Sequence, residues 1–158
     1  MKTLSTIFLS LSLVCAASVS VAETDPDKAI EYRKNIMSMV GGSSGSMAAI
    51  LKGDVEVENK EEMLKILAAG LVSATSADLN LAAFKQNTDG KGSEKTTATS
   101  KVWENWEEFV TIMKRMSDAS VEVQKLAEAG ELTEFKQLRP VVAECRECHG
   151  KGGFRSRR

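Results

Sequence analysis

Apolar residues recur every three or four positions in four stretches of the chain, the spacing of helices that each bury one face. The first stretch opens at Asp25-Pro26, an acidic cap followed by a proline that suits the first helical position. Gly41, Gly42 and Gly45 interrupt it, and each costs about 1 kcal/mol relative to alanine inside a helix. We therefore expect either a weakened middle or a bulky neighbour close to the backbone. The expected inner face is Ile30, Arg33, Met37, Val40, Ser44, Ala48 and Leu51.

The second and third stretches are separated by a long polar segment. The second begins near Asn59, with Glu62 in a position that resembles a capping box. The polar residues 85–100 form a loop, and the third stretch runs from Lys101 to Ala129 and stops at Gly130. The inner face of the second is predicted to be Leu64, Leu67, Leu71 and Ala74. That of the third is predicted to be Val102, Trp106, Phe109, Met113, Met116 and Val123.

The fourth stretch contains Pro140, which removes a backbone donor and should start or kink a helix. Its inner side is predicted to hold Leu132, Phe135, Leu138, Val142, Cys145 and His149. No stretch alternates like a convincing strand, so we predict an all-α fold. Four amphipathic helices, joined as two hairpins and a longer loop, predict an up-down-up-down four-helix bundle.

The N-terminal segment differs from the rest of the chain. Lys2, the apolar run 7–14 and the small residues Ser20-Val21-Ala22 follow the pattern of a secretory signal peptide. We expect residues 1–22 to be removed, together with Cys15, which leaves residues 23–158 as one domain. The apolar run is shorter than the roughly 20 residues of a membrane span, so no span is expected.

The charge balance narrows the choice of partners. The chain has 21 Lys and Arg against 22 Asp and Glu, a formal net charge of −1. This balance gives no basis for general nucleic-acid binding.

Near the C-terminus, Cys145-Arg146-Glu147-Cys148-His149 has the C-x-x-C-H spacing of a covalent haem attachment site. Structural zinc sites use four such ligands, and the mature chain holds only these three. A thioredoxin-like dithiol would follow a strand, whereas the flanking residues here have a helical pattern. A structural disulfide between Cys145 and Cys148 stays open as an alternative. The adjacent His149, the one histidine of the chain, favours one covalently bound haem c, with two thioethers and an imidazole ligand to iron.

A C-terminal C-x-x-C-H resembles that of the class II cytochromes c, comprising cytochrome c′ and its low-spin relatives. Residues 32–37, 47–53 and 101–106 resemble the same family. Because cytochrome c′ is itself a standard example of the up-down bundle, the architecture and the family are not independent predictions. The resemblance implies a bundle with haem near the C-terminal helix and, by analogy with family members, a homodimer.

The resemblance also implies roles for individual residues. Cys145 and Cys148 would form the thioethers, and His149 would be the proximal axial ligand. Arg33 matches a position near a haem propionate. Met37 matches the position that faces the distal side of the iron. From spacing alone, however, Met37 fits core packing and Arg33 fits a solvated or ion-paired position, so both alternatives stay open.

Met37 therefore decides between two functions. The main prediction is that its thioether binds iron and that the protein is a periplasmic electron carrier with His/Met ligation. If it does not, the iron is five-coordinate and the protein is a cytochrome c′ that binds nitric oxide or carbon monoxide. We do not expect an enzyme, because no distal histidine or comparable titratable group accompanies the iron. The redox partners are not identified by the sequence.

The residues after His149 depart from the family pattern. An aromatic and a basic residue usually follow the histidine after two residues, whereas here Gly150-Lys151-Gly152-Gly153 precedes Phe154-Arg155. Either the last helix ends early or Phe154 returns to the bundle by another route. The basic residues of this tail could steer an acidic redox partner or be a frayed, solvated terminus. They are Arg146, Lys151, Arg155, Arg157 and Arg158.

Overall fold

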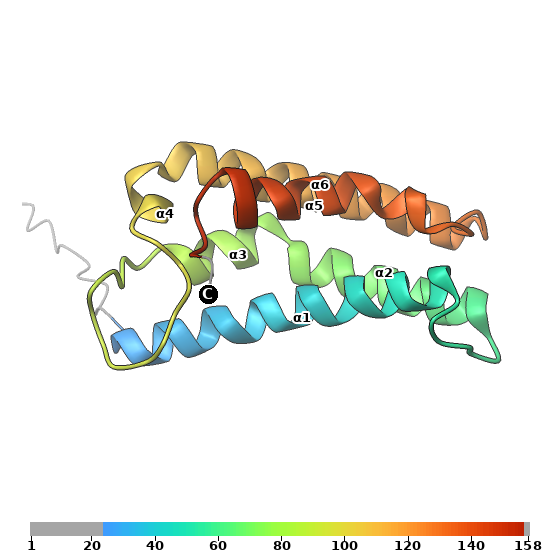
Figure 1. The fold of residues 1–158 in the computed structure, drawn as a ribbon, viewed down its shortest axis with the longest axis horizontal. Coiled ribbons are helices and arrows are strands. Elements are labelled where there is room, and N and C mark those ends of the chain that lie inside the picture. The colour runs from blue at the N-terminus through green and yellow to red at the C-terminus, as the bar shows by residue number, and fades with distance from the viewer. Residues whose placement is uncertain (1–23, 157–158) are drawn as a thin grey trace, which may run out of the picture.

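The computed structural model describes residues 24–156, and the predicted signal peptide 1–22 lies outside them. Long helices run side by side along one axis in Figure 1, so the all-α prediction is confirmed. Helix α1 packs on α2, α2 on α5, and α5 on α6, as in a four-helix bundle. The helices are α1 Pro26–Lys52, α2 Lys60–Thr75, α3 Ala77–Phe84, α4 Lys101–Glu104, α5 Trp106–Glu128, the 3₁₀ turn η1 Phe135–Leu138, α6 Arg139–Arg146 and the π-helical turn η2 Glu147–Lys151.

Helix α1 begins where the sequence predicts and is continuous through its glycines. The Asp25 side chain accepts a hydrogen bond from the Asp27 N–H at 2.9 Å, and Pro26 occupies the first turn. No bulky neighbour from residues 24–156 approaches these glycines. Gly41, Gly42 and Gly45 are exposed, and a Cβ at any of them would meet no atom within 4 Å. Packing of the buried residues on either side of the glycines offsets their low helix propensity.

The buried face of α1 is slightly rotated from the predicted one. Ile36, Met47 and Ile50 are buried, whereas the predicted Met37, Ala48 and Leu51 are only half-buried. The apolar stripe is wider than one strict row of positions, so neighbouring rows compete for the interior.

The second predicted helix is broken in two. Helices α2 and α3 meet at Ser76 with a bend of 43°, and Ser76 itself has φ −45° and ψ 124°. The buried Asn80 side chain donates hydrogen bonds to the Ala74 carbonyl at 2.8 Å and to the Ser76 carbonyl at 3.0 Å, and the Ser76 carbonyl also accepts the Asn80 backbone N–H at 3.0 Å. The Asn59 side chain makes no cap hydrogen bond, although α2 does begin at Lys60.

The third and fourth predicted helices are also interrupted. Asn105, with φ −120° and ψ 49°, separates the four-residue α4 from α5. As predicted, the third helical stretch stops at Gly130, which has φ 72° and follows the end of α5. Pro140 lies in the first turn of α6. Contrary to the prediction, Phe135 is exposed and Val142 only half-buried, because η1 breaks the single helical face on which the prediction rested.

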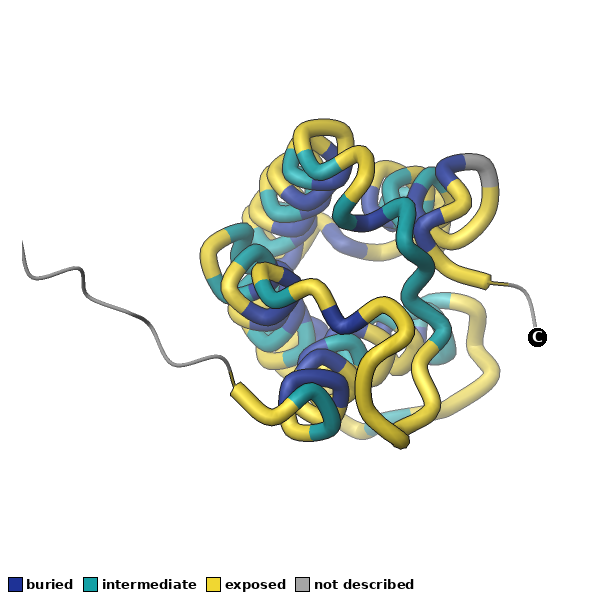
Figure 2. Tube along the Cα trace, turned by 90° about the vertical axis from the view of Figure 1, so that its left-hand side faces the viewer, coloured by how far each residue is buried: buried dark blue, intermediate teal, exposed yellow. Residues whose placement is uncertain are grey.

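Two separate groups of buried side chains fill the bundle, and Figure 2 shows buried positions turned toward its interior. The aliphatic cluster consists of Val40, Met47, Ile50, Leu64, Ala68, Leu71, Ala74, Val123, Ala127, Leu132, Leu138 and Val141. The aromatic cluster, at the end that holds the C-x-x-C-H motif, consists of Ile36, Ala83, Phe84, Val102, Phe109, Ile112, Met113, Met116, Cys148 and Phe154.

No described helix is by itself long and apolar enough to cross a membrane; only the bent α2–α3 pair, taken together, has that length and composition.

Candidate functional site

The C-x-x-C-H motif straddles the change from α6 to the π-helical turn. Cys145 lies in the last turn of α6, and Cys148 and His149 lie in η2. The Gly152 N–H donates to the Glu147 carbonyl at 2.6 Å, the five-residue spacing of a π turn. We predicted that Cys145 and His149 would share one face of an α-helix. The π turn has more residues per turn, so the two side chains are placed differently from that prediction. Cys148 is buried, Cys145 is half-buried and His149 is exposed.

A cavity of about 390 Å³ lies beside this turn, within the range of roughly 300–1,000 Å³ typical of small-molecule and cofactor sites. Its lining comes from α1, the end of α3, the loop 85–100, α4, α5 and the C-terminal segment. Four of the five predicted site residues line it, namely Arg33, Met37, Cys148 and His149. Cys145 does not line it, but packs against the aromatic cluster that forms its wall. The fold thus brings together residues from opposite ends of the chain.

Arg33 is a buried cation on this wall, only 3% exposed. Its guanidinium donates to the Gln86 carbonyl at 3.3 Å and to the Thr88 hydroxyl, and lies 5.4 Å from the ring centroids of Phe84 and Trp103. Burial lowers its pKa, yet an arginine stays protonated. No carboxylate pairs with it among residues 24–156. A guanidinium carries five N–H donors, so these two acceptors leave it able to bind an anion.

The other charged side chains around the cavity are cationic as well. Lys34, Lys95 and Arg155 line it, and no Asp or Glu is among its lining residues. Lys34 also pairs with Glu94 at 3.1 Å, at the surface. The rest of the wall includes Phe84, Val102, Phe109, Met113 and Phe154. An apolar wall with a cationic rim fits a haem, which combines an apolar macrocycle with two carboxylates.

Both cysteines are free thiols here, and burial holds them in the neutral form. Burial raises the pKa of Cys145, and it raises the pKa of Cys148 to about 11. Neither is therefore ionised near neutral pH in the haem-free chain.

The residues after His149 combine both predicted alternatives. The last helix ends at Lys151, and Phe154 then returns to the bundle, where its ring is 2% exposed and 5.8 Å from the Phe109 ring centroid. Gly152 permits the return, because a Cβ there would lie 2.5 Å from the Glu147 carbonyl oxygen and 2.7 Å from the Phe154 ring. Backbone hydrogen bonds then join this segment to the loop, from Thr99 N–H to the Phe154 carbonyl and from the Ser156 N–H to the Thr97 carbonyl.

This return brings a basic residue beside the motif despite the two additional residues. Arg155 lines the same cavity, and its Nε donates to the Thr97 hydroxyl at 3.2 Å. Although His149 is exposed by its surface area, partial desolvation by the surrounding protein first, and then the positive charge of Arg155, lower its pKa. Sequence reasoning missed Thr88, since it does not lie in a periodic stretch.

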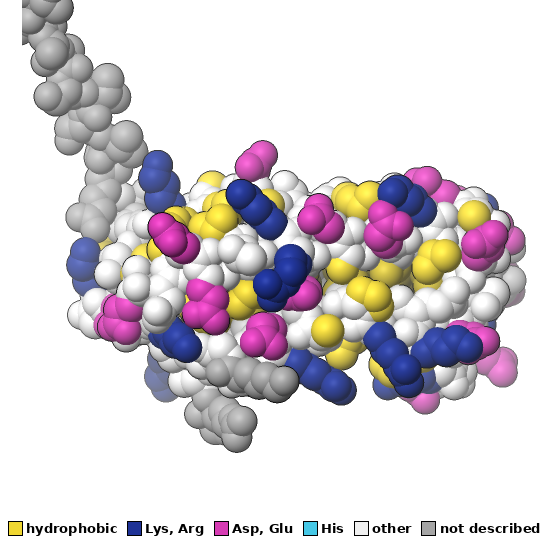
Figure 3. Space-filling model, turned by 90° about the horizontal axis from the view of Figure 1, so that it is seen from above, with side chains coloured by type: hydrophobic (Ala, Val, Ile, Leu, Met, Phe, Trp, Pro, Cys, Tyr) yellow, Lys and Arg dark blue, Asp and Glu magenta, His cyan; other side chains and the backbone are white. Residues whose placement is uncertain are grey.

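Of the rest of the basic tail, the structure describes the side chain of Arg146 alone, which is exposed. Arg157 and Arg158 lie outside the described residues. On the face seen in Figure 3, acidic and basic side chains are interspersed.

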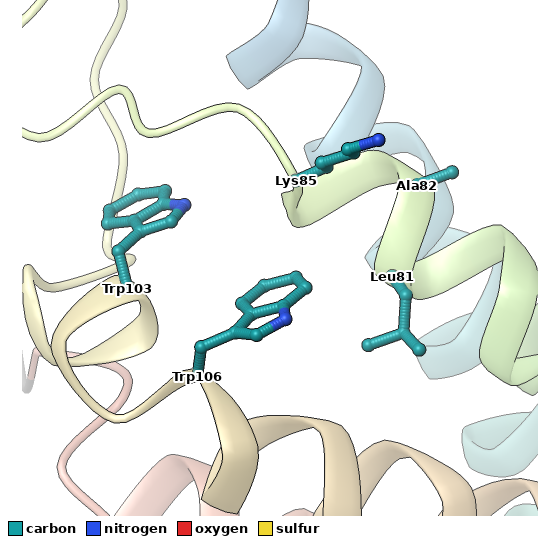
Figure 4. Close-up of a pocket in the computed structure, with 5 residues that line it drawn as sticks. All are labelled: Leu81, Ala82, Lys85, Trp103 and Trp106. Carbon is teal, nitrogen blue, oxygen red and sulfur yellow. The ribbon is translucent and has the colours of Figure 1, made fainter.

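Trp106, predicted on the inner face, is less buried than expected. Trp103 and Trp106 are half-buried at the surface, because Asn105 ends α4 between them. They line a second pocket with Leu81, Ala82 and Lys85 (Figure 4).

Comparison with known proteins agrees with the fold and the motif. The sequence model of the family described as Cytochrome C′ matches residues 28–154. The cytochrome c′ of Rubrivivax gelatinosus is 33% identical over 131 residues, covering 80% of this chain and 94% of the relative. The cytochrome c′ of Rhodospirillum rubrum is 27% identical over 140 residues, covering 87% and 90%. The cytochrome c-556 of Agrobacterium fabrum is 28% identical over 152 residues, covering 94% and 92%.

Among solved structures, ferric cytochrome c′ of Alcaligenes xylosoxidans superposes with a TM-score of 0.68 at 24% identity, covering 85% of this chain and 98% of that one. This likeness supports the fold. The resemblance to the class II cytochromes c and the prediction of haem c are confirmed by the family match. The chain belongs to the cytochrome c′ family, whose members carry a covalently attached haem c.

Proposed function

We propose that this protein is an exported haem protein that binds a diatomic gas, such as nitric oxide or carbon monoxide, at a five-coordinate iron. The observation that carries the proposal is the cavity wall, in which Met37 lies with Phe84, Val102, Phe109, Met113 and Phe154, and which includes no Asp, Glu or histidine other than His149. Met37 itself is half-buried and packs against the aromatic cluster, as a core methionine does. Two of the relatives described above are named cytochrome c′, and a ferrous variant of the Alcaligenes protein has been solved with bound NO.

The roles that we propose for the motif follow from its placement. Cys145 and Cys148 would hold the haem as thioethers, and His149 would be the axial ligand on their side. Their position beside the cavity supports this, since Cys148 and His149 both line it. When bound, the haem iron supplies the gas-binding and one-electron chemistry.

Arg33 would bind a propionate. Its burial without a carboxylate partner supports this role, because a buried charge is costly unless it is paired and hydrogen-bonded. Lys95, which forms no ion pair among the described residues, could supply a second cation at the rim of the cavity.

A second candidate is an electron carrier in which Met37 binds the iron. Two observations favour it: Met37 lines the same cavity as His149, and relatives named cytochrome c-556 are as similar as those named cytochrome c′. A thioether is a soft ligand that favours ferrous haem and raises its potential.

Carbon monoxide discriminates between the two candidates. We expect the reduced protein to bind it readily, with a shift of the main haem absorption band, and we expect Met37→Ala to leave the ferric and ferrous spectra without carbon monoxide unchanged. Met39→Ala is the control, because Met39 is exposed on the same helix. Refusal of carbon monoxide by the wild type, together with binding by Met37→Ala, would instead establish the electron carrier.

The cellular setting is part of the proposal. Residues 1–22 have the pattern of a secretory signal, and covalent haem attachment fits an oxidising compartment such as the periplasm. We propose no enzymatic reaction. The homodimer stays a prediction.

A further inference from the structure

The second pocket, which we call the indole pocket, has a volume of about 380 Å³ and is separate from the haem cavity. Leu81, Ala82 and Lys85 contribute from the end of α3, and Trp103 and Trp106 from the opposite side (Figure 4). None of these five residues lines the haem cavity. An occupant of this pocket would therefore be distinct from the haem.

The walls of the indole pocket are already ordered. The Trp103 indole N–H donates to the Phe84 carbonyl at 2.8 Å, and the Trp106 ring stacks on Phe109 at 5.5 Å between centroids with 26° between the planes. Each indole is only half-buried, so part of its surface stays open to a ligand. A site whose side chains are held before binding loses little entropy when a ligand arrives.

Lys85 supplies the one charged group of the indole pocket. It is exposed and forms no ion pair with any of residues 24–156. Aromatic rings stack favourably on indole faces, and an ammonium donates hydrogen bonds to carboxylates, sulfonates or phosphates. We propose that the indole pocket binds a small planar aromatic molecule that carries an anionic group, with the ring against Trp103 and Trp106 and the anion on Lys85.

The chain offers a direct readout, because its only two tryptophans both line this pocket. In the haem-loaded protein, the two indole N–H resonances can be followed by nuclear magnetic resonance while naphthalene-2-sulfonate is added. We expect both resonances to shift and to saturate. Cyclohexanesulfonate, which is anionic but not aromatic, and 2-naphthol, which is aromatic but neutral, should each bind more weakly.

Two surface variants test the assigned contacts. Lys85→Gln should weaken binding about two- to fivefold, the range expected for an exposed ion pair. Ala82→Glu should abolish it, because a carboxylate would occupy the pocket and repel the anion. Lys114→Gln and Ala69→Glu alter exposed residues elsewhere on helices and should leave binding unchanged.

Several results would overturn the inference. One is the absence of a saturable shift in either indole resonance. Another is loss of affinity in Lys34→Gln with none in Lys85→Gln, since Lys34 lines the haem cavity and the probe would then be bound there. Shifts that follow protein concentration instead of probe concentration would mean that a second copy of the chain covers the pocket. None of these results depends on which ligand the iron binds.

Discussion

The aliphatic and aromatic clusters lie in one bundle but differ in what surrounds them. Apart from Met47, the aliphatic cluster is built from Val, Leu, Ile and Ala on α1, α2, α5, α6 and the turn region before α6. The aromatic cluster contains Phe84, Phe109, Phe154 and several sulfur-bearing side chains. Only the aromatic cluster borders the haem cavity. The difference indicates a division of roles, in which one end supplies stability by close packing and the other leaves space for the cofactor.

The backbone differs between the two ends in the same way. The breaks at Ser76 and Asn105, the π turn Glu147–Lys151 and the return of Phe154 all border the aromatic cluster or lead into it. Breaks and π turns turn side chains in directions that a regular helix does not offer, and π turns are frequent at functional sites. The cavity therefore depends on several departures from regular helix, whereas the aliphatic cluster includes one, the 3₁₀ turn η1 that carries Leu138.

The largest effect is expected from removing both thiols. In Cys145→Ser/Cys148→Ser no thioether can form, so no haem should stay on the denatured chain, as a haem stain after denaturing electrophoresis would show. In hydrogen-exchange mass spectrometry, the amides of residues 97–99 and 154–156 should lose protection relative to the haem-loaded wild type. The amides of α2 should keep their protection. Equal loss at both ends would contradict the division between the clusters.

A cavity created in the aliphatic cluster should lower the stability of the fold without changing the surroundings of the haem. Leu71 is fully buried there, and Leu71→Ala should lower the free energy of unfolding by about 2–5 kcal/mol. Denaturant titration measures this, and the absorption spectrum of the folded protein should stay that of the wild type. Ile66→Ala, at a 56% exposed position of the same helix, should change stability by no more than about 0.5 kcal/mol. An altered haem spectrum in Leu71→Ala would show that the clusters are coupled.

A methyl group at Gly152 should act on the aromatic end. The new Cβ would overlap the Glu147 carbonyl and the Phe154 ring, and forcing these apart should cost about 1–3 kcal/mol. The haem spectrum should also change, because the π turn that carries His149 must shift. Gly150→Ala is the matched control, since a Cβ there meets nothing within 4 Å. Equal behaviour of the two variants would exclude a role for the close contact at Gly152.

The smallest effect on stability is expected from weakening the hydrogen bonds that join the loop 85–100 to α1. The Asp27 carboxylate accepts hydrogen bonds from the Ser93 N–H at 2.6 Å, the Ser93 hydroxyl at 2.7 Å and the Glu94 N–H at 2.7 Å. These bonds, led by that of Glu94, lower the pKa of Asp27. Because the folded pKa lies below the unfolded value of about 3.9, the contribution is fully present above that pH and is lost as pH falls through the folded pKa.

Asp27→Asn should therefore be less stable than the wild type at neutral pH, and the difference should shrink as the pH falls below about 4. Unfolding curves at a series of pH values measure it. Asp118→Asn, at an exposed position of α5, should show no such trend. A difference that stays constant down to strongly acidic pH would rule out ionisation of Asp27 as its source.

Much of the fold could be predicted because it depends on local signals. As expected, α1 begins at Asp25-Pro26, α5 ends just before Gly130, and Pro140 lies in the first turn of α6. The apolar spacing of three and four located most core positions. The breaks at Ser76 and Asn105 carry a weaker signal, because serine and asparagine favour helix N-caps but neither side chain makes a cap hydrogen bond here.

The haem site also contains some residues that local sequence signals predict and others that they do not. Cys145, Cys148 and His149 are adjacent in sequence, so their chemistry can be deduced from spacing and residue type alone. Arg33 and Met37 could be proposed only by resemblance, and whether they face the motif depends on how α1 packs across the bundle. The structure lines one cavity with Arg33, Met37, Cys148 and His149.

The sequence by itself determined the helical class and the nature of the cofactor, because hydrophobic period and cysteine spacing act over a few residues. Tertiary structure decided what surrounds the cofactor: the burial of Arg33 without a carboxylate, the return of Phe154 and the placing of Arg155 beside His149. These depend on contacts between residues more than fifty positions apart, as in the bonds from Arg33 to the loop and from residues 153–156 to residues 97–99. Such contacts are set by packing of the whole bundle, on which local periodicity carries no information.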